Sequence, residues 1–155
     1  MIKINEIKLV PIQQLKPNPQ NRNTHPSEQI ERLIKLIEHQ GFRQPIVVSN
    51  QSGFIVTGHG RLIAAKKLKL THVPVSFQDF DSDEQEYTAQ VSDNAIASWS
   101  ELDLSAIHKD LQNFNPFDID LLGIKDFQFE PIMDIKPVEK NQEVECPNCK
   151  CKFKP

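Results

Sequence analysis

The apolar positions of this chain change their period several times, and these changes divide it into strands and helices. Short apolar runs rich in β-branched residues predict strands over residues 7–12, 44–49, 54–57 and 73–77. Apolar residues at helical spacing predict helices over residues 27–40, 62–70, 82–99 and 102–114, and a short turn or helix over residues 117–123. We therefore expect an α+β fold, a small mixed sheet of about four strands packed by helices, with a helical C-terminal half.

Residues at the ends of these segments sharpen the prediction. Ser27 and Ser82 each stand where a side-chain oxygen can cap the first turn of a helix. Gly41 follows the first helix and is expected to end it as a left-handed cap. Pro74 lies near the start of its strand and predicts an edge position or a strand start, because proline cannot donate to a ladder.

A glycine-containing segment, Gly58-His59-Gly60-Arg61, interrupts the apolar pattern between a strand and a helix. Glycine lets the backbone turn sharply and approach a ligand closely. The following helix directs unpaired N–H groups and its positive dipole end into this segment, and Arg61 can add a bidentate guanidinium. The segment predicts an anion site, above all for phosphate. The competing interpretation is tight strand–helix packing, with His59 as a structural hydrogen-bonding residue.

Two other segments carry polar residues that could serve this site. The loop over residues 15–28 is rich in Asn and Pro and contains Arg22 and His25. We interpret His25 as a turn residue at the start of the helix. Asp93 and Asn94 fall inside a predicted helix although neither is a good helix former, and such exceptions often mark functional or strained positions.

Composition and charge limit the classes of protein. A length of 155 residues suits one domain with a tail, and 38% hydrophobic residues suffice for a core. The chain has no apolar run long enough to span a membrane, and its N-terminus is too polar for a signal peptide, so we expect a cytoplasmic protein with no membrane partner. Residues 1–77 hold 11 Lys and Arg against 4 Asp and Glu, and residues 78–155 hold 7 against 17. The basic half suits an anionic ligand, a nucleotide or nucleic acid, unless the acidic half simply neutralises it.

The three cysteines of the chain, Cys146, Cys149 and Cys151, lie in its last ten residues. A Cys-x-x-Cys turn is half of a zinc site, because two thiolates on one turn can bind the same tetrahedral ion. Cys151 is a candidate third ligand, and a second copy of the chain could complete the site; the alternative is a flexible reduced tail. We expect a domain over residues 1–124 with its core at residues 8–100, a linker over residues 125–145, and a zinc-knuckle-like tail over residues 146–155.

Several spaced motifs in the right order resemble the ParB/sulfiredoxin superfamily. Gly41-Phe42-Arg43-Gln44 resembles its G-x-x-Q segment, and residues 58–64 resemble its Gly-Glu-Arg-Arg-x-Arg-Ala box, of which the arginine Arg61 is kept. Residues 93–97 resemble its Glu-Asn-x-x-Arg box, with Asp93 in place of the acid and Ala97 in place of the arginine. The version here is similar to ParB-like N-terminal domains of the short phage and prophage type, including those joined to DNA methyltransferases.

The resemblance implies a fold, a ligand and a set of contacts. It implies a ParB/sulfiredoxin-like fold and a nucleoside triphosphate, CTP or ATP, bound with Mg²⁺. The implied nucleotide-binding residues are the following: Asn21, Arg22, Gly41, Gln44, Gly58, His59, Gly60, Arg61, Asp93 and Asn94.

Two classes of function follow. We favour a nucleotide-binding, DNA-associated accessory protein of phage or mobile-element origin, which binds DNA weakly and without strong sequence preference. Its expected partners are DNA, a DNA methyltransferase or another phage protein, and a second copy of itself. The alternative is an enzyme of the same fold, a ParB-like nuclease or a small phosphotransferase, for which His59 and Asp93 are the candidate catalytic residues. Sulfiredoxin-type sulfinic acid reduction is not expected, because no cysteine occurs in residues 1–145.

Overall fold

The computed structural model describes residues 4–114, 116–129, 144–145 and 150–153, and these form two units. The first unit comprises residues 1–103 and 118–127, and the second comprises residues 104–117 and 128–155. The first unit contains a four-stranded mixed sheet with the strand order β1-β4-β2-β3. The predicted α+β class and the four-stranded sheet are therefore confirmed.

The sheet is assembled from strands that are far apart in the sequence. β1 (Ile4–Pro11) pairs antiparallel with β4 (His72–Gln78), which pairs parallel with β2 (Ile46–Ser49). β2 in turn pairs antiparallel with β3 (Ile55–Thr57) across a short turn. A 3-10 turn, η1 (Ile12–Gln14), follows β1. The core joins apolar side chains of these strands to α2 (His59–Lys67), and the buried members are Val10, Ile12, Leu15, Ile46, Val48, Ile55, Leu62, Ala65, Val73 and Val75.

The expectation that Pro74 marks an edge or the first residue of a strand was wrong, because Pro74 is the third residue of β4, which lies between β1 and β2. The parallel ladder explains how a proline is accommodated there. β2 pairs with β4 from Val75 to Gln78, so Pro74 lies just before that ladder and faces Leu9 of β1. Its missing N–H group therefore breaks no bond to β2.

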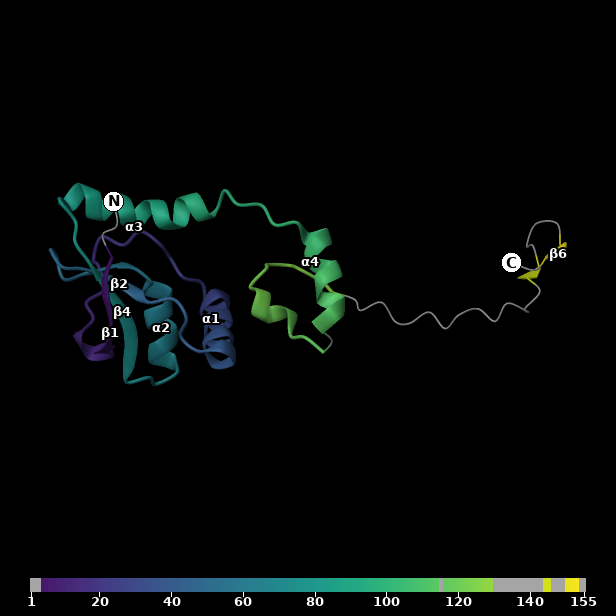
Figure 1. Ribbon diagram of the computed structural model, residues 1–155, viewed down its shortest axis with the longest axis horizontal. Coiled ribbons are helices and arrows are strands. Elements are labelled where there is room, and N and C mark those ends of the chain that lie inside the picture. Colours follow the sequence, from purple (N-terminus) through teal and green to yellow (C-terminus); the bar gives the residue numbers. More distant parts are fainter. Residues whose placement is uncertain (1–3, 115, 130–143, 146–149, 154–155) are drawn as a thin grey trace. The chain divides into compact units, whose positions relative to one another are not determined.

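Helices α1 (Ser27–Gln40) and α2 pack against each other, and Figure 1 shows them side by side next to the sheet. Pro26, and not Ser27, takes the N-cap position of α1, because Ile30 N–H donates to the Pro26 carbonyl (3.2 Å) and starts the helical pattern there. No side-chain capping bond forms at this end. Gly41 ends the helix with a positive φ of 79°, as its glycine predicts, but with an extended ψ of 176°.

Helix α2 begins earlier than its apolar pattern predicts. Leu62 N–H donates to the Gly58 carbonyl (3.0 Å) and closes the first turn, with Gly58 in the left-handed conformation (φ 98°, ψ 21°) at the N-cap. His59, Gly60 and Arg61 consequently belong to the first turn of the helix and not to a loop before it. The backbone N–H groups of this turn therefore have no acceptor within the helix.

Helix α3 (Asp83–Ala97) begins as predicted, since Ser82 Oγ accepts a hydrogen bond from Gln85 N–H (3.2 Å). It contacts β3 and carries Asp93 and Asn94 within its C-terminal part. A short 3-10 helix, η3 (Ile119–Leu122), contacts α1. Asp120 of η3 forms an ion pair with Lys35, and Arg32 of α1 donates to the Ile124 carbonyl (3.4 Å), so residues 118–127 are held to α1 within the first unit.

The second unit is described by itself. It contains α4 (Leu104–Leu111) and a 3-10 turn, η2 (Gln112–Phe114), where the sequence predicted one helix over residues 102–114. The rings of His108 and Phe129 lie 5.0 Å apart. Two short strands, β5 (Val144–Glu145) and β6 (Lys152–Phe153), pair antiparallel, with Glu145 opposite Lys152. In the part of the chain that the structure describes, no helix is long and apolar enough to cross a membrane.

Candidate functional site

The first turn of α2 opens onto a cleft of about 130 Å³. Gly58, His59, Gly60 and Arg61 form its floor, and residues of four other segments complete its wall. Those residues come from β3, from the loop before α1, from α1 itself and from α3, and they include Asn23, His25, Gln29, Leu33, Asp93 and Asn94. The structure thus brings together the two motifs that the sequence placed at positions 58–61 and 93–94.

The two glycines of this turn have different roles. Gly58 needs its positive φ, and a Cβ there would lie 3.1 Å from Arg61 Nη2 and 3.3 Å from Ile46 Cα. Gly60 is buried, and a Cβ on it would lie 3.2 Å from both His25 Nδ1 and Leu33 Cδ1. The absence of a side chain at Gly60 therefore lets α1 and the His25 ring pack directly against α2.

Arg61 is held between the cleft and the start of β2. Its Nη1 donates to Gln44 Oε1 (2.9 Å) and its Nη2 donates to the Pro45 carbonyl (3.3 Å). Burial lowers the pKa of Arg61, and the charge of Asp93 opposes this effect. Its Nε–H group is buried and has no acceptor among the described residues. A buried donor without an acceptor is costly, so this group favours an anion nearby.

His59 lies at the junction between the cleft and the loop after η1. Its Nε2 accepts a hydrogen bond from the backbone N–H of Asn18 (3.2 Å), so Nε2 carries no proton in this arrangement. Burial lowers the pKa of His59, and the charge of His25 adds to this shift. The ring therefore anchors the loop through Nε2, and its burial disfavours the charged form.

His25 is one of the cleft residues that sequence reasoning did not assign to the site. Its Nδ1 lies 3.0 Å from Gln29 Oε1, and its Nε2 is buried without a hydrogen-bond partner among the described residues. The residue does stand just before α1, as predicted, but its ring lines the cleft against Gly60. The feature of the sequence that could have placed His25 in the cleft is its position in an Asn- and Pro-rich loop.

Other predicted site residues lie outside this cleft. Asn21 Oδ1 accepts from Asn23 N–H (3.1 Å) and from Gln90 Nε2 (3.4 Å), so Asn21 shapes the loop, and Arg22 is exposed without lining the cleft. Gly41 and Gln44 line a neighbouring hollow that also borders Arg61. That hollow continues along the C-terminal end of α1.

The predicted metal ligands are only partly within the described residues. Cys146 and Cys149 lie outside them, and Cys151 is exposed. No group of three or more His, Cys, Asp or Glu side chains in the described ranges is arranged to hold a metal ion. Asp93 and Asn94 at the cleft nevertheless supply oxygen atoms of the kind that Mg²⁺ shares with phosphates.

The chain matches known proteins in sequence and in structure. The family model of the ParB N-terminal domain matches residues 1–95. The ParB-like nuclease domain-containing protein YnaK of Escherichia coli (strain K12) is 39% identical over 75 residues, which cover 48% of this chain and 85% of YnaK. Protein ORF326b of Acidianus two-tailed virus is 35% identical over 66 residues, which cover 43% of this chain and 20% of ORF326b.

Solved structures show the same fold. The C-terminally truncated chromosome-partitioning protein ParB from Caulobacter crescentus, complexed with CTP-γ-S, matches with a TM-score of 0.61 and 25% identity over 77% of this chain and 69% of that one. The Pnob8-like ParB-N domain matches with a TM-score of 0.51 and 21% identity over 74% of this chain and 48% of that one. The resemblance to the ParB N-terminal domain is therefore confirmed over residues 1–95.

Proposed function

Because the chain belongs to the ParB N-terminal domain family, we propose that it is a nucleotide-binding, DNA-associated accessory protein. The observation that carries this proposal is the first turn of α2, whose N–H groups and dipole meet a cleft that also contains Arg61. A helix N-terminus with a nearby guanidinium suits the phosphates of a nucleotide. The match to a ParB bound to a CTP analogue makes CTP the first nucleotide to test, and ATP the second.

The residues of the cleft fit a nucleotide bound with Mg²⁺. The N–H groups of the α2 turn and the buried Nε–H of Arg61 would meet phosphate oxygens. Asp93 and Asn94 stand across the cleft, where a carboxylate and an amide oxygen would hold the ion. Phosphates in the cleft would lie near the negative charge of Asp93, and Mg²⁺ would offset the repulsion between them. His59 and His25 would keep the floor of the cleft in shape through the Asn18 bond and the contact with Gly60.

Calorimetry with CTP, ATP and GTP, with and without Mg²⁺, tests this proposal. Arg61→Ala should weaken binding by about 1.5–3 kcal/mol, the range for a hydrogen bond to a charged group. Arg43→Ala is the matched control, since Arg43 is exposed and its Nε donates to the Gln40 carbonyl (2.7 Å). Thermal melting of both variants separates lost binding from lost folding, because Arg61 also holds Gln44 and Pro45. If no nucleotide binds with or without DNA, the proposal is wrong.

DNA association rests on the family and on charge. The excess of basic residues in positions 1–77 gives this part of the chain an attraction for phosphate backbones. Similarity to a viral protein supports an origin in a virus or mobile element, and a DNA methyltransferase or another phage protein remains the proposed protein partner. A second copy of the chain is the further proposed partner.

An enzymatic function is the second candidate, favoured by the similarity to a protein described as having a ParB-like nuclease domain. Asp93 would then hold a metal ion, and His59 would be the second candidate catalytic residue, since it lines the same cleft. Incubation with supercoiled plasmid and Mg²⁺ or Mn²⁺ tests this candidate. Metal-dependent nicking that Asp93→Asn abolishes would support it, whereas nicking retained by that variant would point to a contaminant.

Zinc binding by the tail is a separate proposal. The pairing of Glu145 with Lys152 brings together the segments on either side of the three cysteines. Because these flanking segments pair, less chain ordering would be needed for Cys146, Cys149 and Cys151 to bind one ion. Protein purified under reducing conditions should contain zinc that Cys146→Ser removes. Light scattering with and without chelator then shows whether one ion joins two chains.

A further inference from the structure

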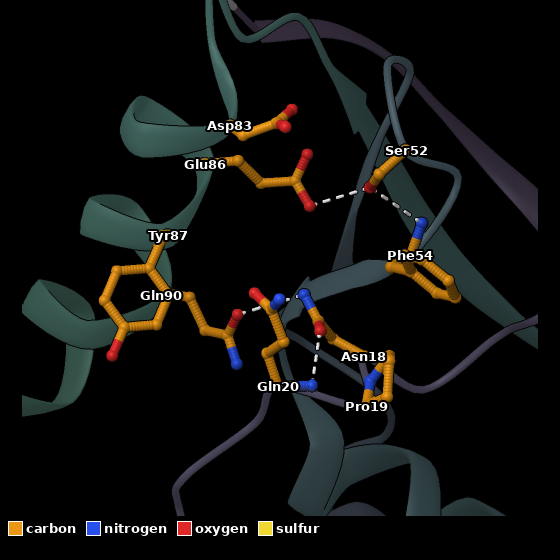
Figure 2. A pocket seen from close by; sticks show the side chains of 9 residues that line it. All are labelled: Asn18, Pro19, Gln20, Ser52, Phe54, Asp83, Glu86, Tyr87 and Gln90. Carbon is orange, nitrogen blue, oxygen red and sulfur yellow. Dashed lines mark hydrogen bonds between the residues drawn. The ribbon is translucent and has the colours of Figure 1, made fainter.

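A second cavity, here called the α3 cavity, lies between α3, the β2–β3 turn and the loop at residues 18–20. Figure 2 shows Glu86 and Gln90 extending from α3 towards Ser52 and Asn18 on the opposite wall. Its volume is about 220 Å³, below the range of roughly 300–1,000 Å³ that is common for drug-sized ligands. The cavity therefore suits a group the size of a side chain.

A chain of hydrogen bonds through Ser49, Ser52 and Glu86 fixes the shape of this cavity. Ser49 is 1% exposed, and its Oγ accepts from the N–H groups of Gln51 (3.1 Å) and Ser52 (3.3 Å), which sets the β2–β3 turn. Ser52 Oγ in turn accepts from Phe54 N–H (3.1 Å) and donates to Glu86 Oε1 (2.7 Å). The dashed lines at Ser52 in Figure 2 mark these last two bonds.

The carboxylate of Glu86 is incompletely satisfied. Glu86 is 6% exposed, and its Oε2 is buried with no hydrogen-bond partner among the described residues. Leaving a buried charged acceptor without a donor is strongly unfavourable, so a hydrogen bond from a bound ligand or partner would stabilise this oxygen. Gln90, at 2% exposure, already uses both ends of its amide, since its Oε1 accepts from Asn18 Nδ2 (3.1 Å) and its Nε2 donates to Asn21 Oδ1 (3.4 Å).

The remaining wall selects the chemistry of that donor. Asp83 adds a second carboxylate, and Tyr87 and Phe54 add aromatic rings. The lining residues drawn in Figure 2 include no cationic side chain that could neutralise the two acids. A planar cation with several N–H donors satisfies both features, because it can bond carboxylates and stack on aromatic faces.

We propose that the α3 cavity binds a guanidinium group, with Glu86 as its main acceptor. The group comes either from an arginine side chain of a partner protein or from a small free guanidinium compound. This site is distinct from the cleft at α2, which contains the helix N-terminus and Arg61 and attracts anions. The two sites adjoin through the bond between Asn18 N–H and His59 Nε2, since Asn18 lines one and His59 lines the other.

NMR titration of the full chain with methylguanidinium tests this proposal. Amide signals of residues 52–54 and 83–90 should shift in a saturable way, whereas N-methylurea, a neutral molecule of similar shape, should not shift them at the same concentration. A parallel titration uses the capped tripeptide Gly-Arg-Gly. Tighter binding of the peptide indicates a partner protein as the source, and equal or weaker binding indicates a free compound.

Two variants make the result decisive. Glu86→Gln keeps the shape of the side chain but removes its charge, and it should weaken methylguanidinium binding at least about tenfold, as expected for a charged hydrogen bond in a buried site. Glu84→Gln removes an exposed acid of the same helix and should leave binding unchanged. If Glu86→Gln does not fold, Tyr87→Leu, at a half-exposed position, removes the aromatic face and should still reduce affinity. Absence of saturable shifts, or equal binding by the Glu86→Gln protein, overturns the proposal.

Discussion

Gly58 combines two demands that a residue with a side chain cannot meet together. Its φ of 98° is unfavourable for other residues, and a Cβ would lie 3.1 Å from Arg61 Nη2. Gly53 has a similar φ of 73° but nothing within 4 Å of its Cβ position. Gly53→Ala should therefore destabilise the protein by about 1–2 kcal/mol, the cost of a left-handed backbone, and Gly58→Ala should cost more.

Urea unfolding of the two glycine variants measures this difference. The excess cost at Gly58 reports the contacts with Arg61 and Ile46, since the backbone cost is shared. Equal destabilisation by both substitutions would show that those contacts relax without cost.

His59 makes stability depend on pH in a defined direction. Burial and the charge of His25 lower its pKa in the folded state below the ordinary value of 6.5. The unfolded chain therefore binds more protons between these two pKa values, so stability is highest above pH 6.5 and falls as the pH decreases below it. Urea unfolding at about pH 7.5 and about pH 5.5 should show a smaller pH effect for His59→Asn than for the parent protein.

His72→Asn is the control for this pH effect, because it removes an exposed imidazole at the start of β4. The prediction is contradicted if the His59 and His72 variants lose the same part of the pH dependence.

At the scale of the element, the two predicted serine caps behave differently. Ser82 caps α3 through its bond from Gln85 N–H (3.2 Å), whereas Ser27 is the first helical residue of α1 and makes no capping bond. Ser82→Ala should therefore cost about 1 kcal/mol of stability, as is typical for the loss of a cap. Ser27→Ala should cost only a few tenths of a kcal/mol, as is usual for a surface substitution.

Denaturant unfolding of both serine variants provides the measurement. Loss of the cap should also increase amide exchange along α3 in the Ser82 variant. This helix carries Glu86, Gln90, Asp93 and Asn94, so the change would reach both sites. A larger loss of stability at Ser27 than at Ser82 would contradict the assignment of the caps.

At the scale of the whole molecule, the uneven charge predicts how DNA binds. The observed affinity should fall with salt with a slope of about −0.9 for each phosphate neutralised. Lys66 and Lys67 are exposed in the last turn of α2, and their joint replacement by Gln should reduce this slope by about 2 if both contact phosphates. Fluorescence anisotropy with duplexes of unrelated sequence, over a range of salt, measures the effect.

Lys8→Gln provides the matched charge control, since Lys8 already pairs with Glu6 (3.1 Å). An affinity that does not respond to salt, or the absence of binding at low salt, would count against DNA association by this chain.

The sequence by itself determined the local structure of this protein. Periodicity identified the four strands of the main sheet and the helices, although it did not predict β5 and β6. Ser82 and Gly41 correctly indicated where a helix begins and ends. The motifs identified the family and the segment that forms the floor of the cleft. These features are readable because they depend on neighbours within a few residues, through backbone conformation, capping bonds and helical or strand periodicity.

Tertiary structure decided which distant groups share a site. Pro74 entered a central strand because the β2 ladder starts one residue later, and His25 joined the cleft because Gly60 leaves room for its ring. Glu86 meets Ser52 across 34 positions of sequence, and Asn18 meets Gln90 across 72. Such contacts follow from the order of the strands and the packing of α3 beside β3, so the orphaned oxygen of Glu86 and the cavity around it exist only once the chain has folded.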